Sequence, residues 1–162
     1  MSAPILVGGE ALYDLVAEAD GGLTGHPGGG PFNTARTIGR LRQPVAFLGR
    51  LSSDRLGATH ERMLADDGVD LGSIVRTADP TTLALASLDA IGAASWSFCS
   101  TGTAAAGLAS RDALAALPPC VSALHVASGA GVHGNDEITA TGSWMPGVEY
   151  VVNVLHADVN EA

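Results

Sequence analysis

A cluster of glycines followed by an asparagine is the stretch of this chain best suited to hold a polar ligand. The residues are Gly28-Gly29-Gly30-Pro31-Phe32-Asn33, at the start of an expected helix. Glycines let backbone amides come close to a ligand, and a helix start adds unpaired N–H groups and partial positive charge. The Asn33 amide both donates and accepts hydrogen bonds, as the hydroxyls of a polyol require. The pattern indicates a site for a hydroxyl-rich ligand, and a flexible glycine loop before an ordinary helix is the alternative.

The composition excludes several other chemistries. All eight basic residues are arginines, so the chain has no lysine for a Schiff base or for the phosphate loop G-x-x-x-x-G-K-[ST]. The formal net charge of −9 argues against nucleic acid or a membrane surface as partner, because both are bound through clustered positive charge. No pair of the five histidines has the spacing of H-E-x-x-H. No G-x-S-x-G motif supports serine catalysis.

A dinucleotide-binding turn is a rival interpretation. The stretch 129–134 fits G-x-G-x-x-G and follows an expected strand. However, residues 135–146 show no helical period, and such a turn normally follows the first strand of its domain. Since the chain contains 21 glycines, one match is weak, and dinucleotide binding stays only as an alternative.

The elements around the glycine cluster alternate between strand and helix. Phe32, Ala35, Ile38 and Leu41 recur at three-residue steps, as on one face of a helix that begins near Pro31. Alternation of this kind predicts parallel βαβ units and therefore an α/β, Rossmann-like core. Strands are expected at residues 4–9, 12–19, 45–48, 123–127 and 150–155. Further helices are expected after a cap at Ser53 or Asp54, ending at Gly68, and from Ser110 or Asp112 to Leu117.

A β-hairpin interrupts this alternation. Residues 82–89 alternate in polarity, Ile91-Gly92 supplies a turn, and residues 94–99 place Trp96 and Phe98 on one face. The hairpin is therefore expected to form a β layer inserted in the α/β core.

Length and composition indicate one domain. A chain of 162 residues, 46% of them hydrophobic, can bury one core but not two. Residues 1–10 contain no basic segment and no long apolar run, so neither a signal peptide nor a membrane span is expected and the cytoplasm is the expected location. Cys99 and Cys120 are too few for a disulfide framework, and we expect them to be buried or half-buried.

Several motifs together resemble the ribokinase-type (PfkB) carbohydrate kinases. Gly28-Gly29-x-x-x-Asn33-x-Ala35 is similar to the family signature G-G-x-x-x-N-x-A. The flanking motifs follow in the family's order and cover roughly residues 5–131. They are Gly8-Gly9-Glu10-Ala11-Leu12-Tyr13-Asp14, Val45–Gly49 with Asp54-x-x-Gly57, Gly68-Val69-Asp70, Pro80-Thr81 and Phe98-x-x-x-Gly102-Thr103-Ala104.

The resemblance implies ATP-dependent phosphorylation of a small carbohydrate hydroxyl, with ATP and Mg²⁺ as cofactors. Asp14 would accept hydrogen bonds from the sugar, because an ionised carboxylate only accepts. Gly28, Gly29 and Asn33 would line the same sugar. A solvated acid near a strand end is the competing interpretation of Asp14.

A substrate lid is also implied. It would comprise about residues 11–27 and 81–101, attached to a single, partial ribokinase-like domain over residues 1–162. Phe98, Gly102 and Thr103 are its expected contact residues.

The family's catalytic segment has no match in this sequence. The family's G-A-G-D aspartate takes the proton from the sugar hydroxyl, whereas Gly129-Ala130-Gly131 is followed by Val132, which cannot accept a proton. We therefore expect a domain truncated at its C-terminal side. It would have no catalytic residue and no ATP site, and would bind sugar at most.

A non-enzymatic role is the second hypothesis. A truncated or degenerate remnant would keep its lid, whose open strand edges can pair with a second subunit. The chain would then be an interaction module, and a homodimer through the lid strands is the expected assembly.

Overall fold

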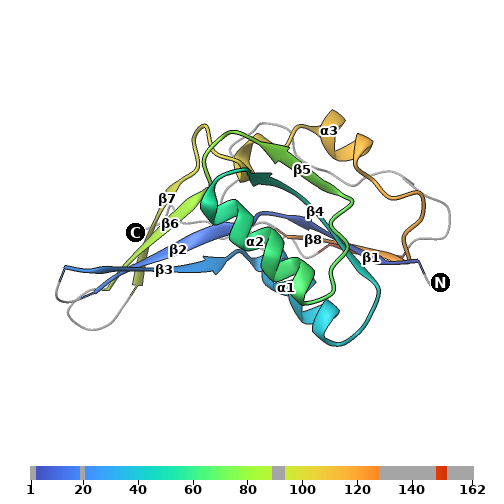
Figure 1. Cartoon of the computed structure of the whole chain (residues 1–162), viewed down its shortest axis with the longest axis horizontal. Coiled ribbons are helices and arrows are strands. Elements are labelled where there is room, and N and C mark those ends of the chain that lie inside the picture. The colour runs from blue at the N-terminus through green and yellow to red at the C-terminus, as the bar shows by residue number, and fades with distance from the viewer. Residues whose placement is uncertain (1–2, 19–20, 89–93, 128–148, 153–162) are drawn as a thin grey trace.

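The residues that the structure describes form two β-sheets. A computed structural model describes residues 3–18, 21–88, 94–127 and 149–152. One sheet has five strands and carries the helices, and a second sheet of four strands extends from one end of it (Figure 1). The fold is therefore the predicted α/β class.

The first sheet, called the core sheet below, is parallel throughout. Its strand order is β5-β4-β1-β8-β9, and each of its neighbouring pairs is parallel. Strands buried on both faces read as continuous apolar runs in the sequence, and the expected strands beginning at residues 4, 45 and 123 correspond to β1, β4 and β8. The strands are β1 (Ile5–Gly9), β4 (Val45–Ser52), β5 (Ile74–Thr77), β8 (Ala123–Ala127) and β9 (Glu149–Val152).

Helices cover both faces of the core sheet. The helices are α1 (Gly30–Arg40), α2 (Arg55–Asp66) and α3 (Ser110–Ala115), with a short 3-10 turn η1 (Ala105–Gly107) before α3. Alternate strand residues point to opposite faces: Val7 and Phe47 join the cluster that contains Phe32 of α1 and Leu64 of α2. Leu6, on the other face, belongs to a cluster that includes Ala113 of α3. This two-faced packing is the Rossmann-like arrangement that the sequence predicts.

Helix α1 connects the core sheet to the glycine cluster. Pro31 lies in its first turn, and Phe32 and Ala35 are fully buried. At its other end Arg36 and Arg40 bind the carboxylate of Asp67 at 2.6 and 2.8 Å, next to the end of α2. The start of α1 is thus held against the core by packing, while ion pairs hold its last turns.

The second sheet is mixed, in the order β3-β2-β6-β7. Strand β2 pairs with β3 antiparallel and with β6 parallel, and β6 pairs with β7 antiparallel. The hairpin predicted around Ile91-Gly92 is thus β6–β7, and it belongs to this separate sheet. The strands are β2 (Leu12–Ala17), β3 (Leu23–Gly28), β6 (Leu83–Leu88) and β7 (Ala94–Cys99).

Three features differ from the sequence predictions. Strand β3 runs through the glycine-rich stretch, and β5 was not predicted as a strand at all. Gly, His and Pro have low strand propensity, but pairing with β2 holds β3 in place. The prediction for Cys99 and Cys120 is wrong: both are exposed. Cys99 lies on β7, the edge strand of the second sheet, where neighbours cover less of each side chain.

Candidate functional site

The carboxylate of Asp14 lies directly against Gly28. Strands β2 and β3 pair so that Asp14 is opposite His26 and Leu12 is opposite Gly28. A Cβ atom built on Gly28 would overlap Oδ2 of Asp14. Because Gly28 has no side chain, the Asp14 carboxylate can occupy this space, and it lies directly against the backbone of Gly28.

Gly29 links this carboxylate to the start of α1. Its φ of 109° lies in the left-handed region, and a Cβ there would overlap the carbonyl oxygen of Glu10. Only glycine fits such a position without strain. Gly29 is the N-cap of α1, and no side chain caps the helix there. The end of α1 with partial positive charge therefore begins directly after Gly28, the residue that contacts Asp14.

Asn33 lies in the first turn of α1 and is exposed. Its backbone N–H donates to the carbonyl of Gly29 at 3.0 Å, and its backbone carbonyl accepts from the Thr37 hydroxyl at 2.8 Å. These two bonds fix the backbone of Asn33 in the first turn of the helix that Gly28 and Gly29 precede. Of the four predicted sugar contacts, Asp14, Gly28 and Gly29 adjoin one another, and Asn33 follows one helical turn later.

The environment of Asp14 disfavours its charged form. Burial raises the pKa of Asp14 above its ordinary value, and the opposing His26 works in the other direction. A half-buried carboxylate has lost part of its hydration. Ligand hydroxyl groups that donate to it would replace the lost water, which is the chemistry expected of a polyol contact.

The residues predicted for the lid lie on β7 and in the turn that follows it. Phe98 is 42% exposed and stacks on Trp96 with ring centroids 6.5 Å apart. Gly102 has a φ of 68° in the turn after β7, and Thr103 is buried, with its hydroxyl 2.7 Å from both the Ser100 carbonyl and the Thr82 hydroxyl. Gly102 and Thr103 line a hollow of about 270 Å³ together with Arg50 and Asp79. Strand pairing places Phe98 opposite Ala84, which is itself opposite Asp14, so Phe98 lies two strands away from Asp14 in the same row of the second sheet.

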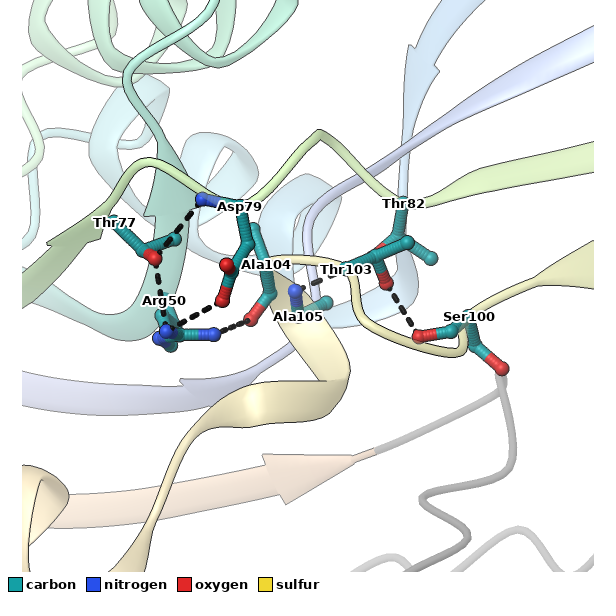
Figure 2. A network of polar contacts seen from close by, with 8 residues as sticks. All are labelled: Arg50, Thr77, Asp79, Thr82, Ser100, Thr103, Ala104 and Ala105. Carbon is teal, nitrogen blue, oxygen red and sulfur yellow. Dashed lines mark hydrogen bonds and ion pairs between the residues drawn. The ribbon is translucent and has the colours of Figure 1, made fainter.

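Arg50, which lines this hollow, is a polar residue that sequence reasoning missed. It is the charged residue of β4, a strand whose other seven residues are buried, and it anchors a network shown in Figure 2. Burial of an arginine requires partners. An arginine within an otherwise apolar strand was the signal in the sequence that could have identified it.

Within residues 3–18, 21–88, 94–127 and 149–152, no group of three or more His, Cys, Asp or Glu side chains could hold a metal ion. Val132 and the stretch 129–134, the rival dinucleotide motif, lie outside the described residues.

Comparison with known proteins identifies the family. The model of the pfkB family of carbohydrate kinases matches residues 3–140, and the fold and the glycine cluster described above agree with it. The chain belongs to this family. Among curated relatives, a fructokinase of Klebsiella pneumoniae is 32% identical over 131 residues, which are 79% of this chain and 41% of that protein. A fructokinase of Escherichia coli is 45% identical over 71 residues, 44% of this chain and 23% of that protein.

Solved structures give the same result for the fold. A fructokinase from Xylella fastidiosa has a TM-score of 0.69 and 31% identity, covering 78% of this chain and 42% of that one. The same enzyme with bound ATP has a TM-score of 0.68 and 28% identity, again covering 78% and 42%. The chain thus spans about two fifths of the length of these relatives.

Within the part of the chain that the structure describes, no helix combines the length and the apolar character needed to cross a lipid bilayer.

Proposed function

We propose that this chain supplies the sugar-binding part of a carbohydrate kinase and that its sugar is fructose. The observation that carries the proposal is the Asp14 carboxylate lying against Gly28, at the entrance to α1. The relatives named fructokinase are the reason for choosing fructose among polyols.

Each residue of the site has a separate task in this proposal. Asp14 accepts hydrogen bonds from two hydroxyl groups of the sugar. Gly28 and Gly29 keep side chains out of the site, so that the ring comes close to the backbone at the start of α1. Asn33 supplies both a donor and an acceptor.

The second sheet is the lid in this proposal. Its strands carry most of residues 11–27 and 81–101, and Asp14 itself lies on β2. ATP is the phosphate donor of the complete enzyme, which would act in the cytoplasm. This chain alone holds the sugar without transferring phosphate to it, since no G-A-G-D segment occurs in its sequence.

Isothermal titration with D-fructose tests the proposal. Asp14→Asn should weaken binding at least about fivefold, because an amide replaces one of two acceptor oxygens with a donor and leaves a sugar hydroxyl unpaired, at a cost of about 1–3 kcal/mol. The matched control is Asp66→Asn, the same change at an exposed residue of α2. Equal affinities of the two variants would refute the site.

A second candidate function is self-association through the lid. Trp96 is 51% exposed and Phe98 42%, and both lie on β7, an edge strand. Large apolar side chains beside an open strand edge favour pairing with another chain. In this alternative the chain is a non-catalytic interaction module, and it forms a homodimer whether or not sugar is present.

A further inference from the structure

Arg50 is a nearly buried charge at the junction of the two sheets. It lies on β4 of the core sheet, and its side chain is 18% exposed. A charge removed from water to this degree requires specific partners to offset the loss of hydration. The partners of Arg50 therefore indicate what the residue does.

These partners come from the two connections that join the core sheet to the hairpin β6–β7. On the entry side, Nη2 of Arg50 donates to the Thr77 hydroxyl at 2.8 Å and pairs with Oδ2 of Asp79 at 2.7 Å. On the exit side, Nη1 donates to the carbonyl of Ala104 at 3.4 Å. One guanidinium group thus holds the chain before β6 and after β7, as Figure 2 shows.

The fold leaves room for this group. A Cβ atom built on Gly107, in η1, would overlap Nη1 of Arg50. The planar guanidinium lies against backbone at this point, and its fork of donors reaches several acceptors at once. Lysine, with a single ammonium group, could not reach both connections together.

A second layer of hydrogen bonds joins the same two connections directly. The Ala104 N–H donates to the Pro80 carbonyl at 2.8 Å, and the Thr82 hydroxyl lies 2.7 Å from that of Thr103. Thr82 also accepts from the Ala105 N–H at 3.2 Å. Both threonines are buried. The entry and the exit of the hairpin therefore form one unit, and Arg50 fixes the position of this unit relative to β4.

This unit is bonded to the strand that carries Asp14. The carbonyl of Thr82 accepts from the Tyr13 N–H at 2.9 Å, and β6 pairs with β2 so that Ala84 is opposite Asp14. A shift of Thr82 relative to the core would therefore move Asp14 relative to the start of α1, which is anchored to the core by Phe32.

We infer that Arg50 is a positioning residue for the sugar site. It fixes the base of the lid to β4, and through Thr82 and Tyr13 it sets the distance between the Asp14 carboxylate and the glycines at α1. The inference rests on the proposed function for its link to sugar, but the mechanical part, the anchoring of the hairpin by Arg50, stands independently.

Two measurements on Arg50→Gln test the two parts. Hydrogen exchange should become at least tenfold faster in β6 and β7, while α1 and β1 keep the wild-type rates, because loss of the anchor opens the hairpin locally. Titration with D-fructose should show binding about tenfold weaker, equivalent to one well-placed hydrogen bond. Arg50→Lys should give an intermediate loss, because it keeps the charge but not the fork.

The matched control is Arg76→Gln. Arg76 makes a two-pronged ion pair with Glu61 at 2.9 and 3.0 Å, but it is 55% exposed and contacts neither connection. This variant should bind fructose within twofold of the wild type. If Arg50→Gln does not fold, Asp79→Asn removes the exposed partner of the same ion pair and should loosen the hairpin in the same way.

The outcomes separate the two proposals. Wild-type affinity and exchange in Arg50→Gln would overturn the inference, and so would faster exchange spread equally over all elements. If the wild-type chain itself binds no fructose, the proposed function fails, and the exchange pattern still decides whether Arg50 anchors the hairpin.

Discussion

The carboxylate of Asp54 binds Thr81 twice, at the point where the chain enters the second sheet. Oδ2 accepts from the Thr81 N–H at 2.8 Å, and Oδ1 accepts from its hydroxyl at 2.7 Å. Oδ1 also accepts from the Gly57 N–H at 2.8 Å, which caps α2. One side chain thus ties the start of α2 to the residues before β6. Arg50 on β4 and Asp54, two residues beyond the end of β4, both hold this connection.

Asp54→Ala should lower the free energy of unfolding by about 2–3 kcal/mol, since it removes a helix cap and leaves the buried Thr81 without its acceptors. Chemical denaturation monitored by circular dichroism measures this. Asp66→Ala, at an exposed position of the same helix, should change stability by less than about 0.5 kcal/mol. Similar losses in both variants would contradict the role assigned to Asp54.

The same residue predicts an acid transition. Burial opposes ionisation of Asp54, but hydrogen bonds from Gly57, Thr81 and Ser52 outweigh it and lower its pKa to about 2. A lowered carboxyl pKa contributes stability above the ordinary value of 3.8, and this contribution is lost as the pH falls toward 2. Between pH 5 and pH 2, the free energy of unfolding should therefore fall more steeply for the wild type than for Asp54→Ala. Parallel curves would show that other carboxyl groups dominate.

His60 predicts a second transition at higher pH. It is fully buried between Tyr13 and Phe32, with ring centroids at 5.2 and 4.8 Å, and Nε2 lies 3.0 Å from the Leu12 carbonyl. Burial is the main cause of its lowered pKa, helped by the charge of Arg36, while Leu12 and Asp54 oppose the shift. As the pH drops below 6.5, His60 becomes protonated in the unfolded chain while it stays neutral in the folded chain, so the free energy of unfolding decreases.

Unfolding free energies at pH 7.5 and pH 5.5 test the role of His60. The wild type should be less stable at pH 5.5 than at pH 7.5. His60→Gln keeps a donor near Leu12 but has no titrating group, so its loss of stability between the two pH values should be smaller. The variant itself should cost about 1–3 kcal/mol at pH 7.5, because it disturbs a buried, aromatic contact. An identical loss on acidification in both proteins would assign the transition to another group.

The parallel core could be predicted because its signals are local. Buried strands such as β1 and β4 are apolar runs, α1 has its helical period after Pro31, and Asp54 is a typical cap before α2. Strand β3 could not be predicted, since its Gly-His-Pro sequence forms a strand only through its pairing with β2. Tertiary pairing here overrides local propensity.

The candidate site likewise contains residues that local sequence patterns predict and residues that only the tertiary structure reveals. The glycines and Asn33 form a motif that a sequence shows directly, and the structure places Gly28 and Gly29 beside Asp14. The partners of Arg50 are 27 to 54 residues away along the chain, and no local pattern marks Thr77 or Ala104 as acceptors. Exposure of Cys99 likewise depends on β7 being an edge strand, which follows from sheet order and not from composition.

The chain alone should show no sugar-kinase activity. A general base typically contributes about a hundred- to ten-thousand-fold to such a transfer, and the sequence has Val132 where the family's pattern has aspartate. The assay is fructose-dependent release of ADP from ATP and Mg²⁺, with protein purified from a strain without fructokinases. Release above the rate without protein would show that other residues supply the base and the nucleotide site.

Self-association should depend on the lid strand. Trp96→Arg should shift the chain toward monomer in analytical ultracentrifugation, because it places a charge on the apolar face next to the open edge of β7. Leu41→Arg is the matched control: Leu41 is 67% exposed but isolated, at the end of α1. A wild-type chain that is monomeric at all concentrations, or equal effects of both changes, would reject the homodimer.

The sharpest test of the sugar site compares two neighbouring glycines. A Cβ atom at Gly28 would overlap the Asp14 carboxylate, whereas a Cβ at Gly30 would have no atom within 4 Å among the described residues. Gly28→Ala should therefore displace the carboxylate and weaken fructose binding at least tenfold, which corresponds to about 1.4 kcal/mol. Gly30→Ala, in the first turn of α1, should bind within twofold of the wild type and be slightly more stable, because alanine has the higher helix propensity. Titration and thermal denaturation of both variants measure the two effects separately. If Gly28→Ala binds fructose as well as Gly30→Ala does, the contact between Asp14 and Gly28 does not form the sugar site.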